Sequence, residues 1–458
     1  MCAGRSADRA GCTQRPATVE QKPRRHTGQR RSGTRPVPRC RVLGRAEACQ
    51  RRVYGLDRVG RLWARDAGNG ERCESFETGQ AVARAGGEGR SVSWPPPVVF
   101  EDSVIVAVSG ALQAFDARSG EMRWSVELVP PAAGDDAKLS LDPRYKQVVV
   151  SIAGSVIAVE ARTGTVRWRR ELLRGAPTGY ELAGPAALVT IDRDGDKLNV
   201  AVQRVSTGDV FVLARKSGEP VFPVDDPSES GQPRSRGIRP VSPQSLTVEQ
   251  MFGLTVFDRD GCRRVFEGSR YEGLFTPPSE QGSIIYPAAV RGSGKAAAFD
   301  RNRNLLLVRS AAVASIAQKP ADDDTHVHVT PFISSLGLPC VPPPWGLLTA
   351  IDMQTGEHRW QVPVGQYRYP GLSLPDATGW GAPEGSGPMI TASGLVFVTS
   401  GQDAQLRVFD VRNGKALWKR SLSAPSLTTP ITYQIDKRQF VLTITTEHSV
   451  AAFALPEQ

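Results

Sequence analysis

One short run combines residue types that could hold a metal ion. It reads ADDDTHVH and contains three carboxylates and two imidazoles, at Asp322, Asp323, Asp324, His326 and His328. Both groups are common metal ligands. The same composition is also typical of a solvated loop ahead of a strand, which would begin here near Pro331. We favour the loop, so the sequence predicts no metal site in this run.

Cysteine spacing indicates no zinc or redox centre. The chain has seven cysteines, and they form neither a CxxC pair nor a Cys/His ligand pattern. Cys2, Cys12, Cys40 and Cys49 lie in or beside the N-terminal stretch, and three others lie in the body. Cys49 with Cys73, or Cys262 with Cys340, could pair in an oxidising compartment. The sequence leaves both pairings open.

Positive charge is concentrated at the N-terminus. The 458-residue chain has a net charge of +10, whereas its first 52 residues hold fourteen Lys or Arg against three acidic residues. A basic segment with few branched or aromatic residues cannot offset its ordering entropy, so we predict a disordered tail at residues 1–50. Phosphate contacts with nucleic acid are the functional alternative. We favour an unstructured extension, with no specific nucleic-acid partner and no secretory signal core.

The organisation of the body comes from a recurring hairpin. Its pattern is an apolar-alternating strand, an acidic residue, a turn with Ser, Thr or Asn before Gly, and a second strand that reaches Trp. Clear copies are residues 112–124, 156–168, 348–360 and 406–418, with weaker copies at 61–73 and 210–222. Glycine supplies positive φ at the turn, and the acidic residue is placed to accept hydrogen bonds from turn amides.

These hairpins predict an all-β propeller. One hairpin cannot bury its own apolar face, so the copies must stack or close into a ring, with Trp124, Trp168, Trp360 and Trp418 as wedges between sheets. A spacing of roughly 50 residues predicts seven or eight four-stranded blades across 51–458. No run of 18 apolar residues indicates a transmembrane segment. The less regular middle section suggests a loop at 226–245, a short helix from Thr247 to Gly253, and then a strand-like LTVFDRDGCRRVF.

The hairpins resemble the repeat of pyrroloquinoline quinone (PQQ) enzymes. From about Arg51 to Leu455, the chain is similar to the membrane glucose dehydrogenase-like branch of the quinoprotein dehydrogenases, which act on glucose, quinate or shikimate. Six ordered blocks carry the resemblance: RLWARDAGNGERCESF (61–76), LTVEQMFGLTVFDRDGCRRVF (246–266), RYEGLFTPPSEQGSIIYP (270–287), PFISSLGLPCVPPPWGLLTAIDMQTG (331–356), GSGPMITASGLVFVTSGQD (385–403) and TTPITY (428–433).

The resemblance implies an eight-bladed propeller that holds PQQ with calcium or magnesium. The cofactor accepts a hydride equivalent from a sugar or polyol, an Asp acts as general base, a Lys or Arg polarises the quinone, and electrons pass to a membrane quinone. Family resemblance also implies a periplasmic location. In relatives, residues around the quinone lie in the region that corresponds to Trp380, Gly385, Ser386, Gly387 and Asp403. These residues are therefore predicted to line the cofactor pocket, and the alternative is that they only build the blade.

At the catalytic positions the chain departs from the family. Aligned through YELAGPAALVTI, the base position is Gly179, and the lysine position is Ser206. The strand at 147–151 runs directly into the next hairpin, without the Thr-Gly-Asn segment and long loop of relatives. Two glycine-rich turns of relatives are replaced by residues 291–297 and 446–449.

Three functions follow from this comparison. The first is a PQQ-dependent dehydrogenase, the second a cofactor-free propeller that binds proteins, and the third a degenerate enzyme copy. Family membership favours the first, whereas the residues at the two catalytic positions favour weakened or absent activity.

Overall fold

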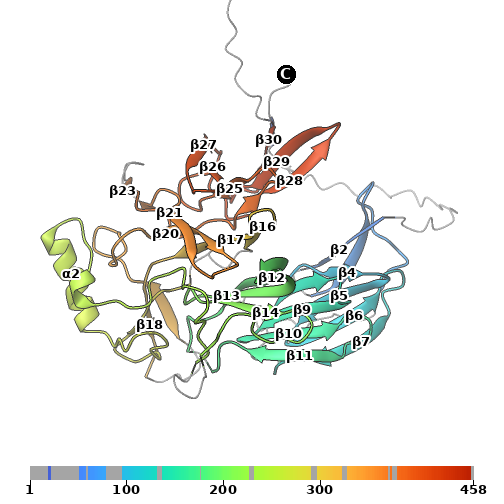
Figure 1. Cartoon of the computed structure of the whole chain (residues 1–458), viewed down its shortest axis with the longest axis horizontal. Coiled ribbons are helices and arrows are strands. Elements are labelled where there is room, and N and C mark those ends of the chain that lie inside the picture. The colour runs from blue at the N-terminus through green and yellow to red at the C-terminus, as the bar shows by residue number, and fades with distance from the viewer. Residues whose placement is uncertain are drawn as a thin grey trace, which may run out of the picture.

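The computed structural model describes most of the chain beyond the basic segment. The described residues are 19–21, 51–57, 60–78, 95–130, 137–175, 177–225, 232–289, 297–321, 327–369, 372–373 and 379–454. Among them, strands dominate and form antiparallel sheets (Figure 1). No helix in these ranges is long and apolar enough to cross a membrane.

The first sheets follow chain order. The N-terminal pair is β2 (Arg52–Leu56) and β3 (Leu62–Asp66), and the next sheet is β4 (Val98–Phe100), β5 (Ser103–Val108), β6 (Ala111–Asp116) and β7 (Met122–Glu127). Then come β8 (Lys138–Asp142), β9 (Gln147–Ile152), β10 (Ser155–Glu160) and β11 (Val166–Glu171), followed by β12 (Leu182–Arg193), β13 (Asp196–Val205) and β14 (Val210–Ala214).

The middle of the chain is interleaved. One sheet has the order β16 (Ala298–Asp300), β17 (Leu305–Ala311), β20 (Gly346–Asp352) and β21 (His358–Pro363). Between β17 and β20, the chain leaves to form β18 (Ser315–Gln318) and β19 (His328–Pro331), which pair with β15 (Ser283–Ile285) in a separate sheet. This excursion and the longer segment between β14 and β16 together account for the gap between the 210–222 and 348–360 copies of the hairpin.

Two sheets and a small strand pair complete the described structure. One sheet is β24 (Met389–Ile390), β25 (Leu395–Thr399), β26 (Gln405–Asp410) and β27 (Ala416–Ser421), and the other is β28 (Ile431–Ile435), β29 (Arg438–Ile444), β30 (Val450–Ala454) and β1 (Val19–Gln21). The pair is β22 (Arg368–Tyr369) with β23 (Leu372–Ser373). Strand β1 comes from the basic segment, whose other residues lie outside the described ranges.

Sheets pack face to face because successive strand residues point to opposite sides. In β5, Val104 and Val106 contact the sheet of β3, whereas Ile105 contacts the sheet of β9. The same alternation joins β9 to β13, β13 to β17 and β20 to β25. Strands buried on both faces read as continuous apolar runs, such as β5.

The four predicted hairpins are confirmed as β6–β7, β10–β11, β20–β21 and β26–β27. As predicted, the acidic residue accepts hydrogen bonds from turn amides. Asp116 Oδ1 lies 2.8 Å from the nitrogens of Arg118 and Ser119, and Asp352 Oδ1 lies 2.9 Å from Gln354 N.

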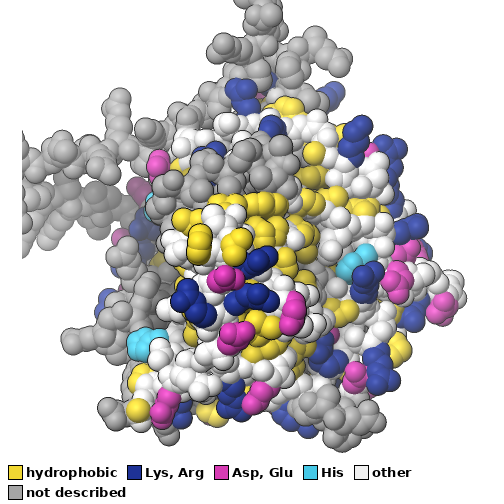
Figure 2. Space-filling view, turned by 90° about the vertical axis from the view of Figure 1, so that its left-hand side faces the viewer, with side chains coloured by type: hydrophobic (Ala, Val, Ile, Leu, Met, Phe, Trp, Pro, Cys, Tyr) yellow, Lys and Arg dark blue, Asp and Glu magenta, His cyan; other side chains and the backbone are white. Residues whose placement is uncertain are grey.

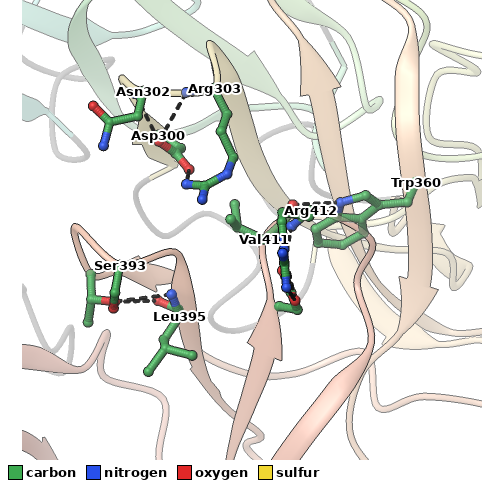
Figure 3. Close-up of polar contacts among 10 residues, drawn as sticks. Asp300, Asn302, Arg303, Trp360, Ser393, Leu395, Val411 and Arg412 are labelled. Carbon is green, nitrogen blue, oxygen red and sulfur yellow. Dashed lines mark hydrogen bonds and ion pairs between the residues drawn. The ribbon is translucent and has the colours of Figure 1, made fainter.

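Three of the wedge tryptophans, Trp124, Trp168 and Trp360, cover the turn glycine of the next hairpin. A Cβ at Gly218 would lie 2.6 Å from the Trp168 ring, and one at Gly414 would lie 2.6 Å from the Trp360 ring. Trp360 Nε1 donates to Val411 O at 2.8 Å (Figure 3). The turn glycine therefore provides positive φ and also room for the preceding indole.

One prediction for the middle section is wrong. Most of the predicted strand LTVFDRDGCRRVF (254–266) is helical, since α2 runs over Val256–Glu267. It follows η2, a 3-10 helix at Val248–Gln250 that lies within the predicted short helix. The Thr255 side chain caps α2 by accepting from Asp258 N at 3.1 Å. Asp258 and Cys262, one helical turn apart, both face the body of the protein.

Of the two disulfides left open by the sequence, Cys262–Cys340 is formed and joins α2 to the loop before β20. Cys73 is also disulfide-bonded. Cys49 lies outside the described residues.

Candidate functional site

Gly179 and Ser206, the positions predicted to match the base and lysine of relatives, lie on segments that connect strands. Segments that lead to the next sheet donate hydrogen bonds to glycine carbonyls in turns between strands. Leu128 N donates to Gly110 O at 2.9 Å, Leu172 N to Gly154 O at 2.8 Å, and Val241 N to Gly208 O at 2.9 Å. Gly179 lies on the connection to β12 and Ser206 on the turn after β13. Ser206 N donates to Glu181 O at 2.9 Å, so the two positions belong to neighbouring segments.

Gly179 has no room for a side chain. Its φ is +100°, and a Cβ there would lie 2.4 Å from Ile285 Cδ1. A carboxylate at this position would require both a strained backbone and movement of a fully buried isoleucine. The adjacent Tyr180 is buried, which raises its pKa to about 12. Its phenol is therefore neutral at physiological pH and supplies no base.

The Ser206 side chain forms a hydrogen bond with a neighbouring segment of the backbone. Its Oγ accepts a hydrogen bond from Glu181 N at 3.0 Å. A serine hydroxyl is neutral and therefore provides no fixed positive charge for a quinone oxygen.

Two buried arginines provide the positive charge near this end of the sheets. Arg204 in β13 donates to Arg309 O at 2.9 Å, and Arg309 in β17 donates to Thr399 O, Ala382 O and Glu384 O at 2.7–3.0 Å. Burial lowers the pKa of each guanidinium to about 10, so both stay charged at neutral pH. Both bridge neighbouring sheets through backbone carbonyls.

The glycine and serine residues predicted near the quinone are buried between strands. A Cβ at Gly385 would lie 2.3 Å from the Arg309 guanidinium carbon, so glycine allows this cation to stack on the backbone. Ser386 Oγ accepts from Thr399 N at 2.9 Å, and Gly387 beside it is also buried. These contacts serve the packing of the β24–β27 sheet.

Asp403 is buried and tied to its own sheet. Its Oδ2 accepts from Gln366 N at 2.7 Å and from the Arg407 guanidinium. Its Oδ1 has no hydrogen-bond partner among the described residues. The carboxylate is therefore held by a neighbouring arginine and a loop amide.

Trp380 belongs to an aromatic cluster. Its ring centroid lies 5.3 Å from that of Trp345 and 5.4 Å from that of Phe252, and Trp345 in turn contacts Tyr367 at 4.8 Å. All of these contacts are with other side chains of the core next to α2. The sequence did not indicate this cluster, since its members lie far apart along the chain.

The described residues contain no group of three His, Cys, Asp or Glu side chains placed to hold a metal ion. His328 lies in β19, exposed. Asp322, Asp323, Asp324 and His326 lie outside the described residues, as do residues 291–296.

Three cavities open near these loops. The cavity that Ser206 lines has about 20 Å³. A second, of about 470 Å³, is lined by Lys138, Ser151, Tyr180 and Glu181, and a third, of about 440 Å³, by Arg239, His358 and several prolines. Small-molecule sites measure about 300–1,000 Å³, so the cavity at Ser206 is too small for a tricyclic quinone. The 470 Å³ cavity beside Gly179 is large enough for an organic ligand, whereas the described residues offer no group of three His, Cys, Asp or Glu side chains for a cation.

Comparison with known proteins shows the family. The chain matches the family described as PQQ: Glucose/ethanol/alcohol dehydrogenase, beta-propeller domain, over residues 13–150 and 144–441. These ranges cover more than half of the chain, which therefore belongs to the PQQ-dependent dehydrogenase propellers.

Particular relatives identify the glucose dehydrogenase-like branch. The quinoprotein glucose dehydrogenase of Escherichia coli (strain K12) is 26% identical over 89% of this chain and 64% of its own. The quinate/shikimate dehydrogenase (quinone) of Acinetobacter baylyi is 28% identical over 90% of this chain and 62% of its own. The glycerol dehydrogenase large subunit of Gluconobacter oxydans is 27% identical over 90% of this chain and 70% of its own. The chain thus spans less than two thirds of the length of the first two relatives.

A solved structure agrees on the fold. The quinohemoprotein alcohol dehydrogenase from Comamonas testosteroni superposes with a TM-score of 0.61, at 18% identity, over 89% of this chain and 66% of its own. The predicted all-β propeller class is confirmed, and the number of blades stays a prediction.

Sequence reasoning missed the buried arginines. Arg309 is the one charged residue of the mostly apolar strand β17, whereas Arg204 shares β13 with Asp196 and Lys197. A lone charge within a buried strand could have marked Arg309, because such a group needs partners from another element.

Proposed function

We propose that this chain is a PQQ-dehydrogenase propeller whose capacity to oxidise a sugar or polyol hydroxyl is weakened or lost. Gly179 carries the proposal, since the position aligned with the general base of relatives has neither a side chain nor space for one. Loss of a positioned general base typically costs about 10² to 10⁴ in rate. The neutral Ser206 at the aligned lysine position adds to this loss.

The family implies PQQ with calcium or magnesium, and we propose that this chain holds that pair poorly. Calcium and magnesium prefer several oxygen ligands. The one buried carboxylate among the predicted quinone residues, Asp403, already pairs with Arg407.

We place the protein in the periplasm, the compartment that its resemblance implies. The Cys262–Cys340 disulfide supports this location, because structural disulfides persist in oxidising compartments.

Reconstitution tests the proposed loss of activity. The purified chain is mixed with PQQ and calcium or magnesium, binding is followed by calorimetry, and dye-linked oxidation is measured with glucose, glycerol and quinate. The glucose dehydrogenase of Escherichia coli serves as the active control. We expect no turnover above the rate of free PQQ. Cation-dependent binding with turnover would refute the proposal.

A second candidate is a cofactor-free scaffold that binds protein. Hydrophobic side chains gather beside charged ones on the side of the molecule where α2 lies (Figure 2). At the start of α2, Leu254, Val256 and Phe257 are 44%, 60% and 87% exposed, and Leu336 nearby is 45% exposed. Buried Asp258 holds these residues together by accepting from Leu254 N at 3.1 Å and Leu336 N at 3.3 Å. Absence of any PQQ binding in the reconstitution would favour this candidate.

A further inference from the structure

The cavity of about 440 Å³ lies apart from the two aligned catalytic positions. Residues 239–245 and 342–344 line it, together with His358 and Gln361 of β21. Its volume is within the range of small-molecule sites. Its lining shares no residue with the cavity of about 470 Å³ beside Gly179. A ligand here would therefore be independent of the activity proposed above.

Hydrogen bonds fix the segment 239–245 along this cavity. Ser242 Oγ donates to Ala311 O at 3.1 Å, and Ser310 Oγ donates to Val241 O at 2.9 Å, so the segment is tied to β17. Gln361 Nε2 in β21 also donates to Val241 O, at 3.2 Å. The cavity is therefore already formed in the folded chain, which is the usual condition of a small-molecule site.

The lining is rich in proline. Five of the lining residues are prolines, namely Pro240, Pro243, Pro342, Pro343 and Pro344. A proline has no backbone N–H, so these segments present rings and few backbone donors. An apolar ligand body would fit against such a lining, and polar recognition would depend on a few side chains.

The charge of the lining has one sign. Its ionisable side chains are Arg239, His358 and Tyr286, and none of the lining residues is a carboxylate. His358 Nε2 lies 3.1 Å from Arg239 O. Burial lowers the pKa of His358, and the charge of the nearby Arg239 guanidinium lowers it further, so the imidazole is neutral at pH 7. Arg239 is exposed, and its guanidinium forms no hydrogen bond or ion pair with the described residues. It therefore supplies a positive charge that no protein carboxylate balances there.

We propose that this cavity binds a small organic carboxylate. The anionic group pairs with the Arg239 guanidinium, whose planar fork of N–H donors matches a carboxylate, and the apolar body of the ligand lies against the proline rings.

A pair of probes tests the charge requirement. Benzoate and benzamide have nearly the same shape, but only benzoate is charged. The full chain, without PQQ or added metal, is titrated with each probe and binding is followed by NMR. We expect a dissociation constant of about 1 mM for benzoate and about tenfold weaker binding of benzamide, since a hydrogen bond to a charged group is lost. Equal affinities, or no saturable binding of benzoate, would overturn the proposal.

Two matched variants locate the site. Arg239→Gln should weaken benzoate binding about tenfold and leave benzamide binding unchanged, because only the ion pair is lost. The control Arg118→Gln removes the same charge from an exposed position in the β6–β7 turn and should change neither affinity. Unfolding midpoints of both variants verify that they fold. Unchanged benzoate affinity in Arg239→Gln, or an equal loss in both variants, would reject the site.

Discussion

Trp168 and Trp418 occupy the same position in two copies of the hairpin but differ in burial. Trp168 is 8% exposed, packs on Gly218 and donates from Nε1 to Arg215 O at 2.9 Å. Trp418 is 43% exposed and meets Phe453 edge to face, with centroids 6.1 Å apart. Among the described residues no glycine turn packs on Trp418, since the strand beside β30 in the next sheet is β1, which comes from the N-terminal part of the chain and not from a hairpin. The contribution of a wedge tryptophan to the free energy of unfolding therefore depends on the hairpin or sheet that follows it.

We expect Trp168→Ala to lower the free energy of unfolding by about 3–5 kcal/mol, because it leaves a cavity and removes one of the two side-chain hydrogen bonds to Arg215 O. Trp418→Ala is the matched control and should cost less than about half as much, since the exposed indole buries less area. Urea denaturation of the two variants and the parent chain checks the difference. Equal losses would contradict the assignment of Trp168 as an inter-sheet wedge.

At the scale of elements, the hairpin turn combines a local and a tertiary requirement. Gly356 has φ of +83°, and a Cβ there would lie 1.9 Å from Gly237 O, in the segment between β14 and η2. Gly70, in a weaker copy, has φ of +75° and nothing within 4 Å of the same point. Both glycines supply the positive φ that the turn requires. Of the two, only Gly356 also lies so close to another backbone segment that a Cβ would not fit.

These two glycines form a matched pair for mutation. Gly70→Ala should cost about 1–2 kcal/mol, which is the strain of a left-handed residue. Gly356→Ala should cost clearly more, because the methyl group would also collide with a backbone carbonyl that cannot rotate away. Thermal or urea unfolding measures both, and a Gly356→Ala variant no less stable than Gly70→Ala would exclude the close approach.

On the scale of the whole molecule, packed sheets account for most of the core, and the segment around α2 is attached differently. Helix α2 contacts the body through an aromatic cluster that includes Trp345 and through the Cys262–Cys340 disulfide. The two cysteines are separated by 78 residues. A covalent link over such a long loop restricts the unfolded chain strongly.

We expect the double variant Cys262→Ala, Cys340→Ala to lose about 2–5 kcal/mol of unfolding free energy. Denaturation of the oxidised parent and the double variant measures the loss. Reduction with dithiothreitol provides the control: it should lower the stability of the parent more than that of the variant, in which, of the described cysteines, Cys73 alone remains disulfide-bonded. An equal response of both proteins would show that the bridge contributes little.

The sequence by itself determined the hairpins, the role of their acidic and glycine residues, the propeller class and the family. These features are local, because alternation, positive φ at glycine and a turn carboxylate act within about a dozen residues. It also placed glycine and serine at the aligned catalytic positions. It failed at α2, where the apolar start resembled a strand and the Thr255 cap was missed.

Only the tertiary structure decided what depends on which sheets are neighbours. The pairing of β17 with β20 across the excursion of β18 and β19, the carbonyl partners of Arg204 and Arg309, and the contact of Gly179 with Ile285 join residues far apart in sequence. Long-range contacts leave no periodic signal along the chain. The sequence aligned Gly179 with the general base of relatives, which stays a prediction, and the structure added that a Cβ at Gly179 would lie 2.4 Å from Ile285 Cδ1.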